Sequence, residues 1–262
     1  MEVLDIKQSQ NKLLNIAKEF DRICRKYSIP YYMIGGTMLG AIRHKGFIPW
    51  DDDMDFGVPI EYYDRVLTLL QEELSSPYRL CTYTTVKRCA SAFAKIDDTT
   101  TCIMDKCQDL KIQDQIGVNI DIFPLFLCDG LDFRIRRLQI IRTINRIIFT
   151  ESSEGQYYKH IIKKTIRAIV PFERKHLLDL IWRLSSKIRG EKYMANLFGV
   201  AGFKEIIPCD VWGKGINYKF ENTSFRGPDK YDDYLTRIYG NYMELPPVEK
   251  RKTHSSNVYT RT

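Results

Sequence analysis

The sequence lacks several features that would define its class at once. No apolar run reaches the roughly 18 residues that a transmembrane helix needs, and the first 12 residues hold no apolar signal-peptide core. The 4 histidines form no cluster, and the 7 cysteines include no C-x-x-C pair. Since zinc sites need such groupings, we predict reduced, mostly buried cysteines. We expect a cytoplasmic protein that touches a membrane only peripherally, at its inner face.

Positive charge is concentrated in one segment. Residues 133–192 carry 15 Lys and Arg against 5 Asp and Glu, whereas the rest of the chain carries 25 against 28. This distribution argues against a nucleic-acid binder coated in positive charge. It favours local attraction to phosphate, so we predict peripheral membrane contact through residues 131–192 and no nucleic-acid partner. A solvated helical face packed on the core is the alternative.

The hydrophobic spacing predicts a mixed α/β (α+β) body. Expected helices cover residues 4–27, 38–44, 60–74, most of 131–190, and 230–239. Expected strands cover residues 31–34, 54–58, 78–85, 90–96, 101–104 and 118–126. We divide the chain into a catalytic core (1–130), a basic helical insertion (131–192) and a loop-rich C-terminal cap (193–262) that packs on the core as part of one structural unit.

Four carboxylates lie within five residues, at Asp51, Asp52, Asp53 and Asp55. Such crowding is usually offset by a cation, and oxygen ligands suit Mg²⁺. Alternation along a strand would put Asp51, Asp53 and Asp55 on one face. An acidic surface turn is the alternative, but the large apolar residues on both sides of the cluster argue against it.

Upstream of this cluster, Gly35-Gly36-Thr37 follows an expected strand and precedes an expected helix. Glycines allow a phosphate to approach the backbone, and a helix N-terminus offers free N–H donors. We expect a tight turn here, with Thr37 capping the helix. A glycine pair is weak evidence alone, so its weight comes from its pairing with the acidic strand.

Asp121 is the third candidate carboxylate, because it stands between two isoleucines on an expected strand. A charge in that setting requires a partner or a metal ion. If its strand lies beside the Asp53/Asp55 strand, three carboxylates converge, an arrangement suited to phosphoryl or nucleotidyl transfer. A salt-bridged strand aspartate is the alternative.

Three stretches of the chain resemble the LicD family, which includes bacterial phosphocholine transferases and the related fukutin proteins. Residues 32–55 (YMIGGTMLGAIRHKGFIPWDDDMD) resemble its long N-terminal signature, and residues 119–125 (NIDIFPL) its second strand motif. Residues 234–254 resemble its C-terminal stretch, with Asn241 where aspartate is usual. The resemblance covers roughly residues 10–125 and 205–254.

The resemblance implies a nucleotidyltransferase-like fold, with a small mixed sheet flanked by helices. It also implies a phosphotransferase of the LicD type. Such an enzyme passes a phospho-alcohol, which we expect to be phosphocholine, from a CDP-activated donor such as CDP-choline to a hydroxyl of a cell-surface glycan and releases CMP. Lipopolysaccharide, teichoic acid and capsular polysaccharide are the implied acceptor classes, as free or lipid-linked glycans.

The resemblance also assigns roles to residues. Asp53, Asp55 and Asp121 would hold Mg²⁺, with Mn²⁺ as the alternative cation, and Asp121 could instead take the proton of the acceptor. The remaining residues would bind nucleotide or phosphate: Gly35, Gly36, Thr37, Arg43 and Lys95. Three alternatives stay open: a nucleotidyltransferase that uses an NTP, a non-catalytic subunit of a glycan-assembly complex, and a D-x-D glycosyltransferase. The order of the motifs argues against the last, and the three aspartates together argue against a non-catalytic subunit.

Overall fold

A central sheet organises the chain in the computed structural model, which describes residues 2–86, 89, 91–103, 116–149, 174–251, 253 and 258–261, without the side chains of 146–149. The helices are α1 (Ile6–Lys26), α2 (Gly35–Arg43), α3 (Ile60–Glu73), α4 (Phe133–Phe149), α6 (Arg174–Ser185), α7 (Cys209–Trp212) and α8 (Tyr231–Tyr239), with short 3-10 helices η2 (Gly202–Glu205) and η3 (Val248–Lys250). The strands are β1 (Tyr32–Met33), β2 (Asp55–Pro59), β3 (Tyr78–Cys81), β4 (Ala94–Asp98), β5 (Thr101–Ile103), β6 (Asn119–Cys128), β7 (Tyr193–Ala195), β8 (Ile206–Pro208), β9 (Ile216–Phe220), β10 (Thr223–Gly227) and β11 (Val258–Thr260).

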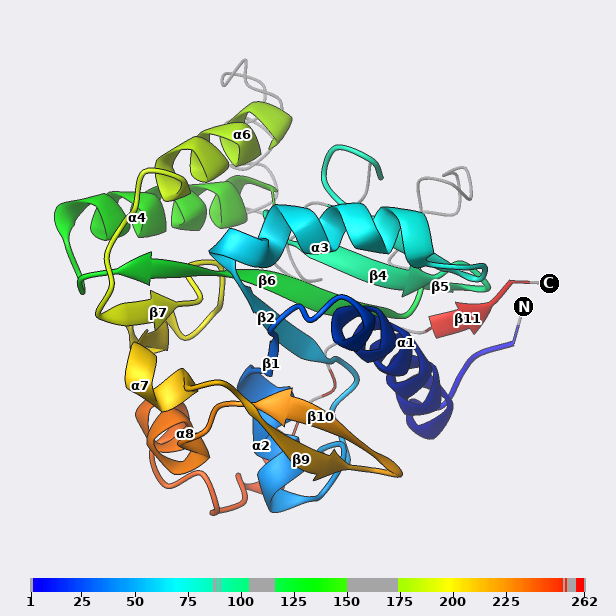
Figure 1. Ribbon diagram of the computed structural model, residues 1–262. Coiled ribbons are helices and arrows are strands. Elements are labelled where there is room, and N and C mark those ends of the chain that lie inside the picture. Colours follow the sequence, from blue (N-terminus) through cyan, green and yellow to red (C-terminus); the bar gives the residue numbers. More distant parts are fainter. Residues whose placement is uncertain are drawn as a thin grey trace.

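The strand order of the central sheet is β1-β2-β6-β4-β3, and β7 and β8 extend it beyond β6 (Figure 1). Strands β2 and β6 are parallel, and the other pairs in this sheet are antiparallel. β6 pairs with β4 through Ile122 and with β7 from Phe126 onward. Pro124 lies between these two paired stretches, which is where a residue without an N–H group is tolerated in a central strand.

Helix α1 begins at a capping box, in which Asp5 accepts the Gln8 N–H at 2.7 Å and Gln8 accepts the Asp5 N–H at 2.7 Å. Its apolar face covers one side of the sheet, and the Phe20 and Phe56 ring centroids lie 5.1 Å apart. Helix α3 packs on the same side, where the Tyr63 hydroxyl donates to the Ile122 carbonyl at 2.8 Å. The opposite side of β2 and β6 faces away from these two helices.

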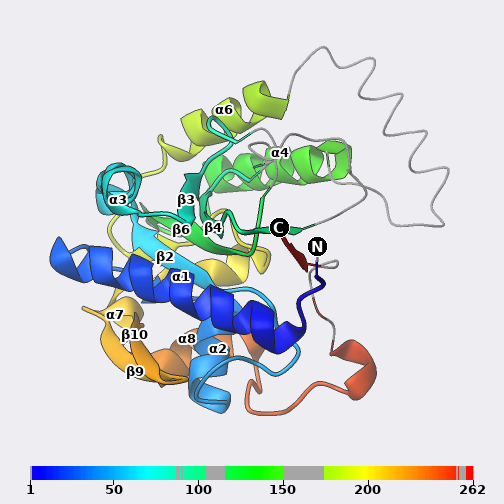
Figure 2. The same cartoon turned by 90° about the vertical axis from the view of Figure 1, so that its right-hand side faces the viewer.

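The remaining elements close the molecule around this sheet. Helices α4 and α6 pack together near the β7 end of the sheet, while α2, α8 and the β9–β10 hairpin form a second group beside β1 (Figure 1). The chain termini lie side by side, because β11 pairs with β5 and Val3 bridges Tyr259 (Figure 2). No helix in the described ranges is long and apolar enough to cross a membrane.

The predicted mixed α/β class is confirmed, and most predicted elements are found with shifts of a few residues. The tight turn at Gly35-Gly36-Thr37 is wrong, since these residues form the first turn of α2. The strand predicted over 118–126 is found and continues to Cys128. The described cysteines are free, and all but the half-buried Cys209 are buried, as predicted; Cys107 and residues 150–173 of the basic segment lie outside the described residues. The three-part division of the chain stays a prediction.

Candidate active site

Asp55 and Asp121 are direct neighbours across the sheet. They are register partners on the parallel strands β2 and β6, which places their backbones roughly 4.8 Å apart. Phe56 packs toward α1, so alternation turns Asp55 to the opposite face of the sheet. The predicted convergence of the two carboxylate strands is therefore confirmed.

Lys95 completes this row of charges from the next strand. It is the register partner of Asp121 on β4, and its ammonium group forms an ion pair with the Asp121 carboxylate. The Lys95 Nζ also donates to the Asn119 Oδ1 at 3.1 Å. Burial disfavours the charged lysine, but the Asp121 carboxylate outweighs this effect, and the pKa of Lys95 is raised. Lys95 is thus a largely buried cation fixed beside the third carboxylate.

The charge balance of the row is negative. Burial, and after it the carboxylates of Asp53 and Asp121, raise the pKa of Asp55 well above its ordinary value, while Lys95 opposes this shift. One ammonium group therefore faces three carboxylates. A site of this kind favours binding of a further cation, because that cation would stabilise the ionised form of all three.

A cavity of about 220 Å³ opens beside this row. Six polar side chains line it: Ser9, Asp52, Asp53, Lys95, Asn119 and Asp121. The expected alternation of residues 51–55 is wrong, because β2 begins only at Asp55 and the preceding residues have no regular structure. Neighbouring Asp52 and Asp53 consequently line the same cavity.

The first turn of α2 borders the row on the β2 side. A Cβ atom added at Gly35 would lie 3.3 Å from the Asp55 Oδ2, and one at Gly36 would lie 3.0 Å from the Asp51 Oδ2. Gly35 has a φ of +55°, which side-chain-bearing residues rarely adopt, and its N–H group donates to the Tyr234 hydroxyl at 2.9 Å. Glycine is therefore required here both by conformation and by the closeness of two carboxylates.

Thr37 has a different task from the predicted cap. Ile34 occupies the N-cap position without a side-chain hydrogen bond, and the buried Thr37 hydroxyl accepts the Asp55 N–H at 2.8 Å. This bond ties α2 to the first residue of β2. The threonine thus positions the strand that carries Asp55.

Arg43 is not brought to the carboxylates by its position on α2. It ends the helix, about 12 Å along the axis from Gly35. Its guanidinium donates to the Tyr242 carbonyl at 2.9 Å and to the Glu244 carbonyl at 3.3 Å. Its contact with a nucleotide stays a prediction, while its observed contacts hold the C-terminal segment against α2.

The donor set fits a hard divalent cation by its chemistry, since Asp53, Asp55 and Asp121 offer only carboxylate oxygens. In the described part of the chain, however, no three His, Cys, Asp or Glu side chains are gathered around one point as a metal site. The carboxylates of Asp55 and Asp121 are adjacent, and that of Asp121 is engaged by Lys95. The metal assignment of the three aspartates therefore remains a prediction.

The structure adds residues that sequence reasoning did not assign to the site. Asp51 lies against Gly36, Asn119 shares the Lys95 ammonium with Asp121, and Tyr234 binds the Gly35 N–H. Asn119 could have been found two residues before Asp121 on the same strand face. Tyr234 lies almost 200 residues from Gly35, so no local pattern indicates their contact.

Comparison with known protein families matches residues 28–126 to the family described as LicD/FKTN/FKRP, nucleotidyltransferase domain. The matched segment runs from the end of α1 to β6 and therefore contains the glycine pair and the whole charged row.

Individual relatives extend this similarity. The chain is 29% identical over 265 residues to the lipopolysaccharide cholinephosphotransferase LicD of Haemophilus influenzae, with 97% of both chains covered. It is 24% identical over 123 residues to the ribitol-5-phosphate transferase FKTN of Macaca fascicularis, covering 47% of this chain and 22% of the relative. An uncharacterised protein of Rickettsia prowazekii is 44% identical over 46 residues, 18% of this chain and 17% of its own.

Proposed function

We propose, from the match of residues 28–126 to the LicD-family nucleotidyltransferase domain, that the chain is a phosphotransferase that moves a phospho-alcohol onto a glycan hydroxyl. We propose phosphocholine as the group, CDP-choline as its donor and CMP as the leaving product. The observation that carries this proposal is the pairing of Asp55 with Asp121 beside the glycine turn of α2. The near full-length similarity to a cholinephosphotransferase supports the choice of alcohol.

In the proposed reaction, an acceptor hydroxyl oxygen attacks the phosphorus atom that bears the alcohol. A new P–O bond forms as the P–O bond to CMP breaks, and the acceptor proton leaves to a base. Asp121 is the proposed base, because its carboxylate lies in the row and lines the cavity. The neighbouring Lys95 ammonium would neutralise negative charge that develops on the leaving CMP.

The donor phosphates are assigned to the first turn of α2, where Gly36 and Thr37 sit at the positive end of the helix. The carboxylates of Asp51 and Asp55 lie against the same turn. Phosphate and carboxylate repel each other, so this arrangement needs a cation between them. We propose Mg²⁺, or Mn²⁺ in its place, held by Asp53 and Asp55; when bound, it would polarise the transferred phosphoryl group. Asp121 would be the third ligand only in the alternative in which it does not act as the base.

A membrane-facing surface belongs to the same proposal. Phe133, Ile140 and Ile144 on α4 are 76%, 61% and 45% exposed, and their spacing of seven and four residues puts them on one stripe. Exposed arginines flank the stripe at positions 134, 136 and 137. Apolar side chains among arginines suit an anionic lipid surface. The double variant Phe133→Ser/Ile140→Ser should therefore sediment less with vesicles of phosphatidylcholine and phosphatidylglycerol than the wild type does. Equal sedimentation of the variant and the wild type would contradict a membrane-facing role for this stripe.

Two other functions remain candidates on the same scaffold. A nucleotidyltransferase would attack the α-phosphate of an NTP and release pyrophosphate. A non-catalytic subunit of a glycan-assembly complex would release neither product.

Product release separates these functions in one assay. Wild type, Asp53→Ala and Asp210→Asn are incubated with a lipid-linked glycan extract and CDP-choline, CDP-ribitol, CDP-glycerol or CTP, with Mg²⁺ or EDTA. Asp210 is a matched control, since this carboxylate lies on the surface in an ion pair with Lys230. We expect metal-dependent CMP release from CDP-choline that Asp53→Ala abolishes and Asp210→Asn retains. Pyrophosphate release from CTP would favour the nucleotidyltransferase, and no release from any donor would favour the subunit.

A further inference from the structure

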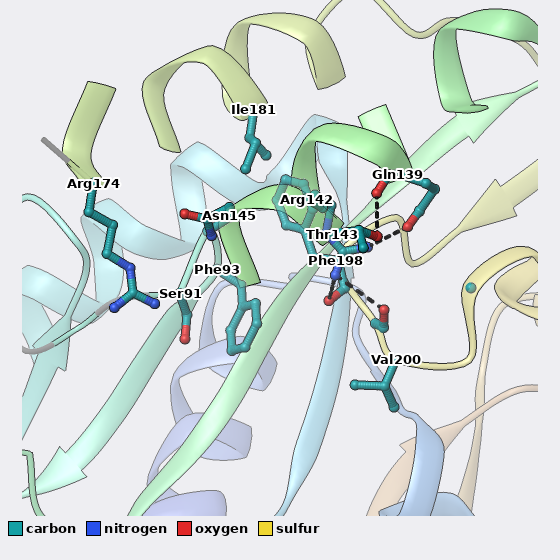
Figure 3. A pocket seen from close by; sticks show the side chains of 13 residues that line it. Ser91, Phe93, Gln139, Arg142, Thr143, Asn145, Arg174, Ile181, Phe198 and Val200 are labelled. Carbon is teal, nitrogen blue, oxygen red and sulfur yellow. Dashed lines mark hydrogen bonds between the residues drawn. The ribbon is translucent and has the colours of Figure 1, made fainter. Parts of the chain in front are cut away.

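A second cavity, of about 380 Å³, lies between α4, α6, the segment before β4 and the loop after β7 (Figure 3). Its volume falls within the range of small-molecule sites, roughly 300–1,000 Å³. No residue of the charged row lines this cavity.

Phe93 connects the second cavity to the charged row. Its ring lines the cavity and packs on Phe123, with ring centroids 4.0 Å apart. Phe123 follows Asp121 by two residues, so both lie on one face of β6. The Lys95 Nζ lies 5.3 Å from the Phe93 ring centroid. The cavity therefore begins one side chain away from the Lys95–Asp121 pair.

The wall formed by α4 is rigid and polar. Arg142 donates to the carbonyls of Leu197, Phe198 and Gly199, and to the Gln139 side chain at 2.9 Å. These bonds hold the loop that forms the facing wall (Figure 3). Arg142 is thereby occupied in shaping the cavity, and contact with a ligand falls to other side chains.

Asn145 is the side chain best placed for that contact. Its Oδ1 is buried at the cavity wall and has no hydrogen-bond donor among the described residues. A buried acceptor without a donor is costly unless a ligand or water supplies one. The rings of Phe93 and Phe198 line the same cavity. An aromatic ring near amide and hydroxyl groups suits a sugar, whose C–H face packs on the ring while its hydroxyls bond the polar groups.

We propose that this cavity binds a saccharide unit of the acceptor glycan. The inference rests on the proposed function, which puts the donor phosphates at α2. In the strand order, α2 borders the row at β2 and Phe93 borders it at β4, so donor and acceptor approach Asp121 from opposite sides. Val200, 94% exposed at the cavity lining, leaves one side accessible to a glycan from solvent.

Steady-state kinetics and a binding measurement test the proposal together. The probes are CDP-choline and core oligosaccharide released from Gram-negative lipopolysaccharide by mild acid. The variants are Asn145→Ala, the cavity-filling Ala92→Phe, and Asn222→Ala as a matched control in the exposed β9–β10 turn. We expect the KM for oligosaccharide to rise at least tenfold in the first two variants and to stay unchanged in the control. The KM for CDP-choline should not change. The rate of CMP release without oligosaccharide, where water replaces the acceptor hydroxyl, should also stay the same in all variants.

Saturation-transfer NMR of the oligosaccharide supplies a readout without turnover. Its signal should be present with wild type and Asn222→Ala and lost with Asn145→Ala. An unchanged oligosaccharide KM and NMR signal in both cavity variants would overturn the saccharide site while CMP release still supports the transferase. A raised KM for CDP-choline alone would instead assign the cavity to the donor and also overturn the proposal. Absence of CMP release in wild type would be a failure of the proposed function, and the NMR result would then decide the saccharide site by itself.

Discussion

Lys95 and Asp121 face each other across the β4–β6 pair as register partners, and their side chains form an ion pair beside the Asp55 carboxylate. Their side chains are only 17% and 19% exposed. The pair therefore joins two functions in one place. The Lys95 ammonium neutralises one carboxylate of a crowded acidic row. It also holds Asp121 at the cavity of about 220 Å³, where the acceptor hydroxyl is proposed to react.

Lys95→Met should destabilise the fold by about 3 kcal/mol, because it leaves a largely buried carboxylate without its cation. The double variant Lys95→Met/Asp121→Asn should recover most of this loss, since the unpaired charge is removed as well. Urea unfolding of wild type, Lys95→Met, Asp121→Asn and the double variant forms a double-mutant cycle, which measures the coupling free energy between the two side chains. Additive losses in the double variant would contradict a direct interaction. CMP release from CDP-choline should fall at least tenfold in each variant, including the stable double variant.

Thr37→Val should lower stability by about 1–3 kcal/mol, because the Asp55 N–H would lose its acceptor in a buried setting. CMP release should fall too, since this bond positions the start of β2. Thr37→Ser keeps the hydroxyl and is the matched control. Denaturant unfolding and initial rates are measured on both variants. Wild-type stability and rates in Thr37→Val would contradict a role for this hydrogen bond.

Gly35→Ala separates crowding from backbone strain when it is compared with Gly240→Ala. Both glycines have a positive φ, +55° and +73°, so each alanine should cost about 1–2 kcal/mol of stability. Only the alanine at Gly35 would approach a site carboxylate, at 3.3 Å from the Asp55 Oδ2, whereas nothing lies within 4 Å at Gly240. We therefore expect similar losses in thermal unfolding but loss of CMP release only for Gly35→Ala. Equal rates in both variants would contradict a role for this close approach.

The sequence was sufficient to predict the elements that carry strong periodicity and the residues of the charged row. The Asp121 strand was expected beside the Asp55 strand, and the register confirms it. Alternation could not be extended to Asp51 and Asp53, because the strand begins at Asp55 and tertiary contacts set the preceding backbone. The glycine pair favours a turn in the sequence, since glycine disfavours helix, yet Tyr234 and two carboxylates require the small residues in the first turn of α2.

Long-range pairing explains what else was missed. The β9–β10 hairpin and the β7–β8 extension of the sheet occupy a region rich in glycine, where short strands give little periodic signal. The second cavity was also beyond prediction, because its walls come from four separate stretches of the chain. The place of Asn145 at the cavity wall follows only from the packing of those stretches. In the sequence, an asparagine on a basic helix indicates only a solvated surface.

Glu205 should make the stability of the protein depend on pH. It is 8% exposed, and its carboxylate accepts the Ala201 N–H at 2.7 Å. Burial raises the pKa of Glu205 to about 7, although the Ala201 N–H and the Arg142 guanidinium oppose the shift. The folded state therefore holds this proton more tightly than the unfolded state, whose glutamate pKa is about 4.3. Stability should fall by about 3 kcal/mol as the pH rises from about 4.5 to about 7, and the loss from this group should be complete above that window.

Glu205→Gln keeps an oxygen acceptor for Ala201 and removes the charge, so its unfolding free energy should exceed that of the wild type at pH 8 and approach it at pH 4.5. The measurement is the unfolding free energy in urea, plotted against pH for the wild type and Glu205→Gln. A constant difference between the two proteins across this range would mean that Glu205 has the same pKa in the folded and the unfolded state.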